Sequence, residues 1–154
     1  MSRFFALVAP LLVASLAFMP DARAEALVTL ESKYSVKDTL DRLTRGLEAA
    51  GIKVAARVDH AAGAAAVGSA LPPTEVVIFG NPKLGTPLMQ SNPMIGADLP
   101  LKVLAWQNAA GKVMVGYTSA ADLKKRFGIA DKDAQFDAMA KALDGLTKAA
   151  AQGN

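Results

Sequence analysis

The chain has 154 residues, no cysteine and a formal net charge of +3 at pH 7. The lack of cysteine excludes disulfides, thiol catalysis, Fe–S ligation, thiolate zinc sites and c-type haem attachment, so buried apolar surface must stabilise the fold. The charge is too weak to favour a nucleic acid or an anionic surface as a partner.

The N-terminal segment, residues 1–24, is predicted to be a secretory signal. Arg3 precedes the apolar run 4–19, and Ala22-Arg23-Ala24 has the small-residue pattern of a cleavage site. The alternative is a membrane anchor, but the run is shorter than the roughly 20 residues that span a bilayer. We therefore expect cleavage near Ala24, a periplasmic or secreted bacterial protein without a stable membrane anchor, and one domain over residues 25–154.

The first part of this domain has a strand, a helix and a second strand. Residues 27–34 alternate between apolar and polar side chains, which predicts a strand. Ser35 begins a capping-box-like pattern, and an apolar stripe at steps of three and four over residues 36–50 predicts a helix that Gly51 ends. Residues 52–58 alternate again and predict a strand with one solvated face.

The next segment is rich in alanine and glycine. Asp59 is suited to cap a short helix that ends near Val67, but the same residues also suit a mobile loop. After Pro72-Pro73, residues 75–79 form a continuous apolar run, which predicts a strand covered on both faces.

Two helix starts compete after that strand. Asn81-Pro82 and Thr86-Pro87 each place a capping residue before a proline. A helix that began at Pro82 would hold Pro87 in its interior, where proline removes a hydrogen bond. We therefore expect a turn at residues 81–85 and a short helix at about residues 86–92.

A hairpin and two helices complete the chain. Residues 101–107 and 112–118 predict paired strands, and Gly111 suits a position of positive φ in the loop between them. Ser119 begins a second capping-box-like pattern, and the helix that follows is expected to end at Gly128.

The last helix is expected over residues 132–150, with Asp131 as its cap. Most connections between the strands are too short for parallel crossovers. The order therefore predicts an α+β domain with a largely antiparallel sheet and helices on one face. Because an open sheet has edges that must be covered or paired, homodimerisation is one expected solution.

Two strings and several shorter motifs resemble the bacterial family called domain of unknown function 302, or DUF302. The strings are FGNPKLGTPLMQSNP, from Phe79, and DLPLKVLAWQNAAGKVMVGY, from Asp98. The likeness covers about residues 35–130. It implies the β-α-β(4)-α arrangement of folds like that of the TATA-binding protein. It implies neither an activity nor DNA binding, because function depends on sites and not on folds.

Four residues of the family motifs are our candidates for ligand binding: His60, Asn81, Asp98 and Tyr117. Each also has a structural interpretation. His60 and Asn81 suit the ends of strands or the starts of helices, Asp98 suits a turn, and Tyr117 suits the sheet. If the four side chains meet in one concavity, the ligand-binding interpretation is favoured, and the excursion from Gly80 to Pro100 is where we expect a pocket wall.

Three hypotheses follow for the function. The first is a periplasmic, non-catalytic accessory domain that binds a small ligand or a protein, without a cofactor. The second is a copper-type metal protein in which His60 acts with Asp59, Asp98 or a methionine, although the methionines are scattered in the sequence. The third is a small hydrolase or isomerase with His60 as its base.

Overall fold

The computed structural model describes residues 27–153, so the predicted signal segment lies outside the described residues. No helix in this part of the chain combines the length and the apolar character needed to cross a bilayer. The elements in chain order are β1 (Val28–Ser32), α1 (Val36–Ala49), β2 (Lys53–Asp59), α2 (His60–Ala66), β3 (Thr74–Gly80), α3 (Pro82–Ser91), the 3-10 helix η1 (Pro93–Ala97), β4 (Leu101–Gln107), β5 (Val113–Tyr117), α4 (Ala120–Phe127) and α5 (Asp133–Gln152).

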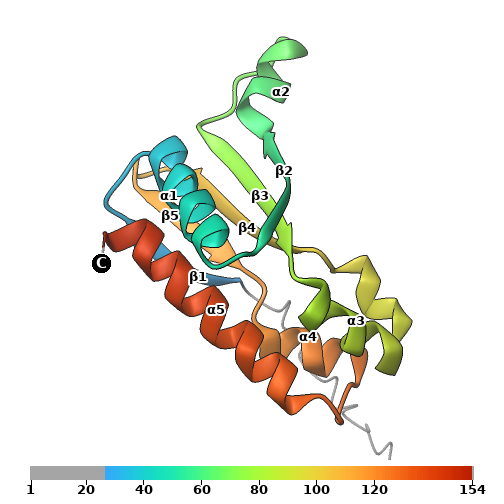
Figure 1. Cartoon of the computed structure of the whole chain (residues 1–154). Coiled ribbons are helices and arrows are strands. Elements are labelled where there is room, and N and C mark those ends of the chain that lie inside the picture. Colours follow the sequence, from blue (N-terminus) through green and yellow to red (C-terminus); the bar gives the residue numbers. More distant parts are fainter. Residues whose placement is uncertain (1–26, 154) are drawn as a thin grey trace, which may run out of the picture.

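The five strands form one antiparallel sheet in the order β1-β5-β4-β3-β2 (Figure 1). The strands β2 to β5 pair with their neighbours along the chain. Strand β1 pairs with β5 and forms the edge of the sheet opposite β2. The α+β architecture predicted from the sequence is thus confirmed.

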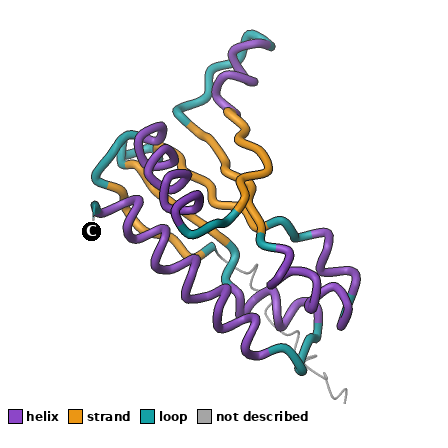
Figure 2. The backbone as a smooth tube through the Cα atoms, in the orientation of Figure 1, coloured by secondary structure: helices purple, strands orange, loops and turns teal. Residues whose placement is uncertain are grey.

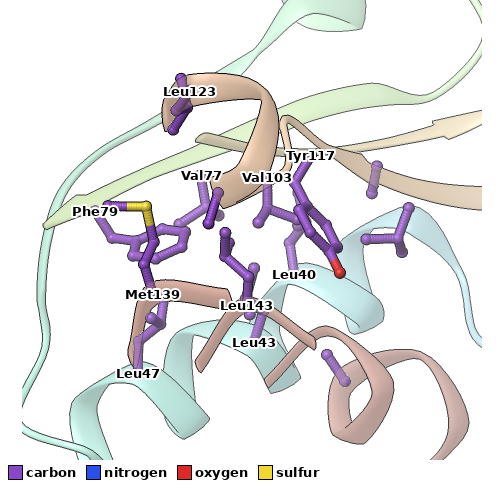
Figure 3. Packing of buried hydrophobic residues seen from close by; sticks show 14 of the residues in the cluster. Leu40, Leu43, Leu47, Val77, Phe79, Val103, Tyr117, Leu123, Met139 and Leu143 are labelled. Atoms are coloured by element: carbon purple, nitrogen blue, oxygen red, sulfur yellow. The ribbon is translucent and has the colours of Figure 1, made fainter. Parts of the chain in front are cut away.

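Helices α1 and α5 cover one face of the sheet, and the core lies between them and the strands (Figures 1 and 3). The apolar stripe of α1 supplies Leu40, Leu43 and Leu47, all fully buried. Alternate positions of the central strands point at this stripe, because side chains on a strand alternate between its two faces. The core-facing side chains of the sheet include Val77, Phe79, Val103, Ala105, Val115 and Tyr117.

The predicted helix caps and turns are largely confirmed. The Ser35 hydroxyl accepts a hydrogen bond from the Asp38 amide at 3.1 Å, and Ser119 caps α4 in the same way. Gly111 adopts a φ of 76° in the hairpin loop, a conformation that glycine tolerates better than other residues.

The predicted turn at residues 81–85 is wrong, because α3 begins at Pro82 and contains Pro87. Asn81 caps the helix through its side chain, and Pro82 needs no hydrogen bond at the first helical position. Pro87 removes the donor that would pair with the Lys83 carbonyl, but Lys83 is exposed, so water can satisfy that carbonyl.

The predicted cap of the last helix is also wrong. The N-cap of α5 is Lys132, which makes no side-chain capping bond. The Asp131 carboxylate instead accepts hydrogen bonds from the Ser91 hydroxyl at 2.7 Å and from the Lys132 ammonium group. The bond from Ser91 ties the Asp131 carboxylate to the end of α3, and the carboxylate makes no capping bond to α5.

The alanine-rich segment forms the helix α2, which settles the alternative left open by the sequence. Asp59 caps it by accepting a hydrogen bond from the Ala62 amide at 2.8 Å. None of its side chains is buried, and the helix projects from the body of the domain beyond the ends of β2 and β3 (Figure 2). Beyond its end Val67 is 79% exposed.

Candidate functional site

A pocket of about 400 Å³ lies at the end of the sheet where β2 begins and β3 ends. Its walls come from the start of β2, the end of β3, α3, the residues before β4 and the middle of α5. The lining residues are Ile52, Lys53, Ala55, Phe79, Gly80, Asn81, Pro82, Leu84, Gly85, Thr86, Met89, Leu99, Pro100, Leu101, Met139, Ala142 and Leu143. The excursion from Gly80 to Pro100 therefore forms one wall, as predicted.

The tight path of the excursion depends on its first residue. A Cβ atom at Gly80 would lie 3.3 Å from the Cβ of Pro100, so glycine allows the chain to leave the sheet and return at close range. Asn81 then caps α3, and Asn92 caps η1 by accepting from the Met94 amide at 3.0 Å. Two short helices thus fill the interval between β3 and β4.

The interior of the pocket is apolar. Phe79, Met139 and Leu143 are almost completely buried and belong to the main core, so the floor of the pocket is continuous with it (Figure 3). Met89 is 39% exposed and lies beside Gly85 and Gly96. A flexible thioether in this position can adapt to ligands of different shape.

Three lining residues carry polar side chains: Lys53, Asn81 and Thr86. The Asn81 Oδ1 atom accepts from the Lys83 amide at 3.0 Å, and this capping bond fixes its orientation. The Asn81 Nδ2 group donates to no residue that the structure describes, and the side chain of Lys53 forms no ion pair or hydrogen bond there. Both donors are therefore available to a ligand.

The structure does not bring the four predicted site residues together. Asn81 lines the pocket, whereas His60 follows the opposite end of β2. The ladder places Lys53 beside Gly80, and Asp59 is six positions further along the strand. At about 3.3 Å per residue, His60 lies roughly 20 Å along the strand from the pocket.

Asp98 and Tyr117 lie at the same end of the sheet as Asn81, but outside the pocket. The Asp98 carboxylate accepts a hydrogen bond from Arg126 at 2.6 Å and borders a second cavity of about 40 Å³. Tyr117 is part of the core (Figure 3), where burial raises the pKa of its hydroxyl and the neighbouring Thr147 hydroxyl partly opposes that rise. Whether either residue binds a ligand stays a prediction.

The arrangement does not favour the two hypotheses that depend on His60. Asp98 lies at the other end of the sheet, and Asp59 is used as the cap of α2. Among the residues that the structure describes, no three His, Cys, Asp or Glu side chains are grouped in a way that could hold a metal ion. A base at His60 would also have no partner from the pocket wall.

The sequence profile of the family described as "Domain of unknown function DUF302" matches residues 28–148, which is most of the chain. The chain belongs to the DUF302 family. The fold agrees with a crystal structure of an uncharacterised conserved DUF302 protein from Bacillus stearothermophilus. That structure superposes with a TM-score of 0.73 at 18% identity and covers 84% of this chain and 100% of the other.

Curated relatives of this DUF302 chain carry the name of an ion channel. "Fluoride-specific ion channel FluC 1" of Brucella suis is 44% identical over 126 residues, which are 81% of this chain and 50% of that protein. "Fluoride-specific ion channel FluC 2" of Brucella melitensis is also 44% identical over 126 residues and is matched over 47% of its length. The DUF302 chain thus spans about half the length of the curated relatives it matches.

Sequence reasoning found Asn81 and the excursion but missed most of the DUF302 pocket. Lys53 lies in the predicted strand over residues 52–58 and Met139 in the predicted helix over residues 132–150, and neither pattern indicates a pocket. Ala142 carries no sequence signal, because alanine is common in helices of every kind. Only its position three residues after Met139, on the same face of α5, connects it with the pocket.

Proposed function

We propose that this DUF302 domain is a non-catalytic binding domain that takes a small, largely apolar ligand into the pocket beside α3. We place it in the periplasm, after cleavage near Ala24. The observation that carries the proposal is the pocket itself, whose walls are largely apolar and include the partly exposed Met89. Its volume is in the range of small-molecule sites, which are roughly 300–1,000 Å³.

The wall supports binding better than it supports catalysis. Among the described residues that line the pocket there is no His, Asp or Glu to act as a general base. Transfer of apolar ligand surface into such a pocket is favourable by roughly 25 cal/mol per Å². Affinity would therefore come from burial of the ligand, with the few polar groups setting its orientation.

The test is binding of an uncharged fluorescent probe, N-phenyl-1-naphthylamine, to the purified chain. We expect blue-shifted, saturable fluorescence that the variant Ala142→Phe reduces at least tenfold in affinity, because the larger side chain fills the pocket. The matched control is Ala140→Phe, since Ala140 is exposed on the same helix and does not line the pocket. Equal binding by both variants, or no saturable binding by the natural chain, would reject the proposal.

A second candidate function is suggested by the curated relatives. We infer that the domain serves as an accessory module in membrane ion transport, because 126 residues of a chain named as a fluoride channel are 44% identical to it. The test deletes the matched segment from the Brucella suis protein and measures fluoride efflux from vesicles. Reduced efflux that this chain restores when grafted in its place supports the inference, and unchanged efflux contradicts it.

A further inference from the structure

Three of the residues that line the pocket have polar side chains, and none of the three is acidic. The side chain of Lys53 ends in an ammonium group, that of Asn81 carries an Nδ2 amide group that donates to no described residue, and that of Thr86 ends in a hydroxyl. Two of these groups can only donate hydrogen bonds, and the third can donate or accept. No Asp or Glu is among the described residues that line the pocket, so the only formal charge on its wall is positive.

The sheet register brings two of these residues to the same end of the sheet. Lys53 lies directly opposite Gly80 in the antiparallel ladder of β2 and β3. Asn81 follows Gly80 in the chain, so the residues that carry the ammonium group and the free amide are neighbours at the end of the sheet. The side chain of Lys53 is exposed and forms no ion pair or hydrogen bond with a described residue, so its charge is not compensated within this part of the protein.

The start of α3 lies at the same end of the sheet but offers little to an anion. Pro82 has no N–H group, and the Lys83 amide donates to Asn81 Oδ1 at 3.0 Å. The amides of Leu84 and Gly85 donate to the Asn81 carbonyl at 2.9 and 3.0 Å. A phosphate group, which is usually held by several free amides at a helix N-terminus, would not find them here.

We propose that the ligand is an anionic amphiphile: an apolar chain or ring system that fills the pocket and a carboxylate that is bound by Lys53 and Asn81. This inference rests on the pocket being a ligand site, as proposed above. A carboxylate accepts hydrogen bonds from both donors, and a bond between two charged partners is about twice as strong as one between neutral groups. A cationic amphiphile would meet the uncompensated charge of Lys53 and find no carboxylate to bind.

The experiment displaces N-phenyl-1-naphthylamine with three ligands of equal chain length and different head groups. These are decanoate, methyl decanoate and decyltrimethylammonium, each used below the concentration at which it forms micelles. We expect decanoate to bind at least tenfold more tightly than methyl decanoate, and decyltrimethylammonium to bind most weakly. Equal affinities of decanoate and its methyl ester would overturn the inference.

Two variants test the residues that hold the carboxylate. Lys53→Met should abolish the preference for decanoate over its ester. Asn81→Asp keeps a good helix cap but replaces the donor with a negative charge, so it should weaken decanoate binding at least tenfold. The matched control is Lys102→Met, because Lys102 is an exposed strand lysine that does not line the pocket.

The outcomes separate this inference from the one on which it rests. If the probe does not bind to the natural chain, the proposed binding function fails. If the probe binds and the preference for decanoate is absent, or survives in Lys53→Met, only the inference that Lys53 binds an anionic head group is wrong. Thermal unfolding of each variant, followed by circular dichroism, verifies that a lost preference does not reflect an unfolded chain.

Discussion

At the scale of single residues, Arg57 connects three elements of the fold. Its guanidinium donates to both oxygens of Glu75, with one distance of 2.9 Å, and to the Asp41 carboxylate on α1. The pKa of Asp41 is lowered, first by the hydrogen bond from Lys37 and then by that from Arg57. The pKa of Arg57 is raised, chiefly by Glu75. Arg57 therefore fastens the edge strand β2 to both its neighbouring strand and the helix above it.

Replacement of Arg57 by methionine should lower the free energy of unfolding by about 1–3 kcal/mol, because Glu75 is left largely buried without its partner. The measurement is urea denaturation. The control is Lys112→Met, which removes an ion pair with Glu31 in which both side chains are more than half exposed. That change should stay within about 0.5 kcal/mol. Equal losses in the two variants would contradict the structural role of Arg57.

At the scale of elements, α3 is the least firmly held part of the pocket. Leu88 is its one buried residue among those described, and Pro87 removes an internal hydrogen bond. The helix therefore depends on its cap at Asn81 more than α1 depends on Ser35, since α1 buries a full apolar stripe. A weakly anchored helix that forms one wall can move to admit a ligand.

Asn81→Ala should weaken the helix by about 1 kcal/mol, which is the usual cost of a lost N-cap. Because the loss is confined to α3, it should appear as faster amide hydrogen exchange in residues 84–91, with little change elsewhere. Asn81→Ser keeps a capping oxygen and serves as the control. If both variants exchange equally fast in α3, the cap does not stabilise this helix.

The helices that the sequence predicts correctly are those whose caps and apolar stripes lie close together in the sequence. The stripe and cap of α1 lie within 16 residues and needed no tertiary information. The start of α3 is not predicted correctly because the cost of a proline inside a helix depends on its surroundings. Here the proline leaves the carbonyl of Lys83 without a donor, and Lys83 is an exposed residue, where water can replace that donor. The cap predicted at Asp131 is wrong for a similar reason. Its carboxylate bonds to Ser91, which is 40 residues away in the sequence and so cannot be identified from the neighbouring residues.

At the scale of the whole molecule, the sheet separates the candidate residues into two groups. Consecutive antiparallel strands run in opposite directions, so residues that follow β2 and residues that follow β3 must lie at opposite ends. His60 and Asn81 are such a pair, and the predicted order of strands already implied their separation. The pocket could not be predicted in the same way, because its volume depends on how α5 packs against an excursion almost 60 residues earlier.

The projecting arm around α2 should be dispensable for folding and for binding. Replacement of residues 60–74 by Asn-Gly, a pair that favours a tight hairpin turn and would join Asp59 to its ladder partner Glu75, should change the free energy of unfolding by less than about 1 kcal/mol. The reason is that no side chain of α2 is buried. Probe affinity should be unchanged, since the pocket lies at the other end of the strands. Lost affinity in a folded variant would show that the arm contributes to the site.

The homodimer expected from the open sheet edges stays a proposal. Leu27 and Val28 at one edge and Val58 at the other are each about 40% exposed. Analytical ultracentrifugation of the purified chain measures its oligomeric state directly. A monomer at concentrations up to about 100 µM would contradict the proposal, because stable interfaces usually bind more tightly than that.

The pairing of β1 with β5 has a consequence for the order in which the chain can fold as it emerges N-terminus first. Val28 pairs with Tyr117, so β1 has no partner in the described sheet until β5 has emerged. Strands β2, β3 and β4 can form a meander earlier, because each pairs with its neighbour in sequence. The final step also joins Lys33 to the Ala151 carbonyl at 2.9 Å. The N-terminal strand must therefore wait, unpaired, for the C-terminal part of its own chain.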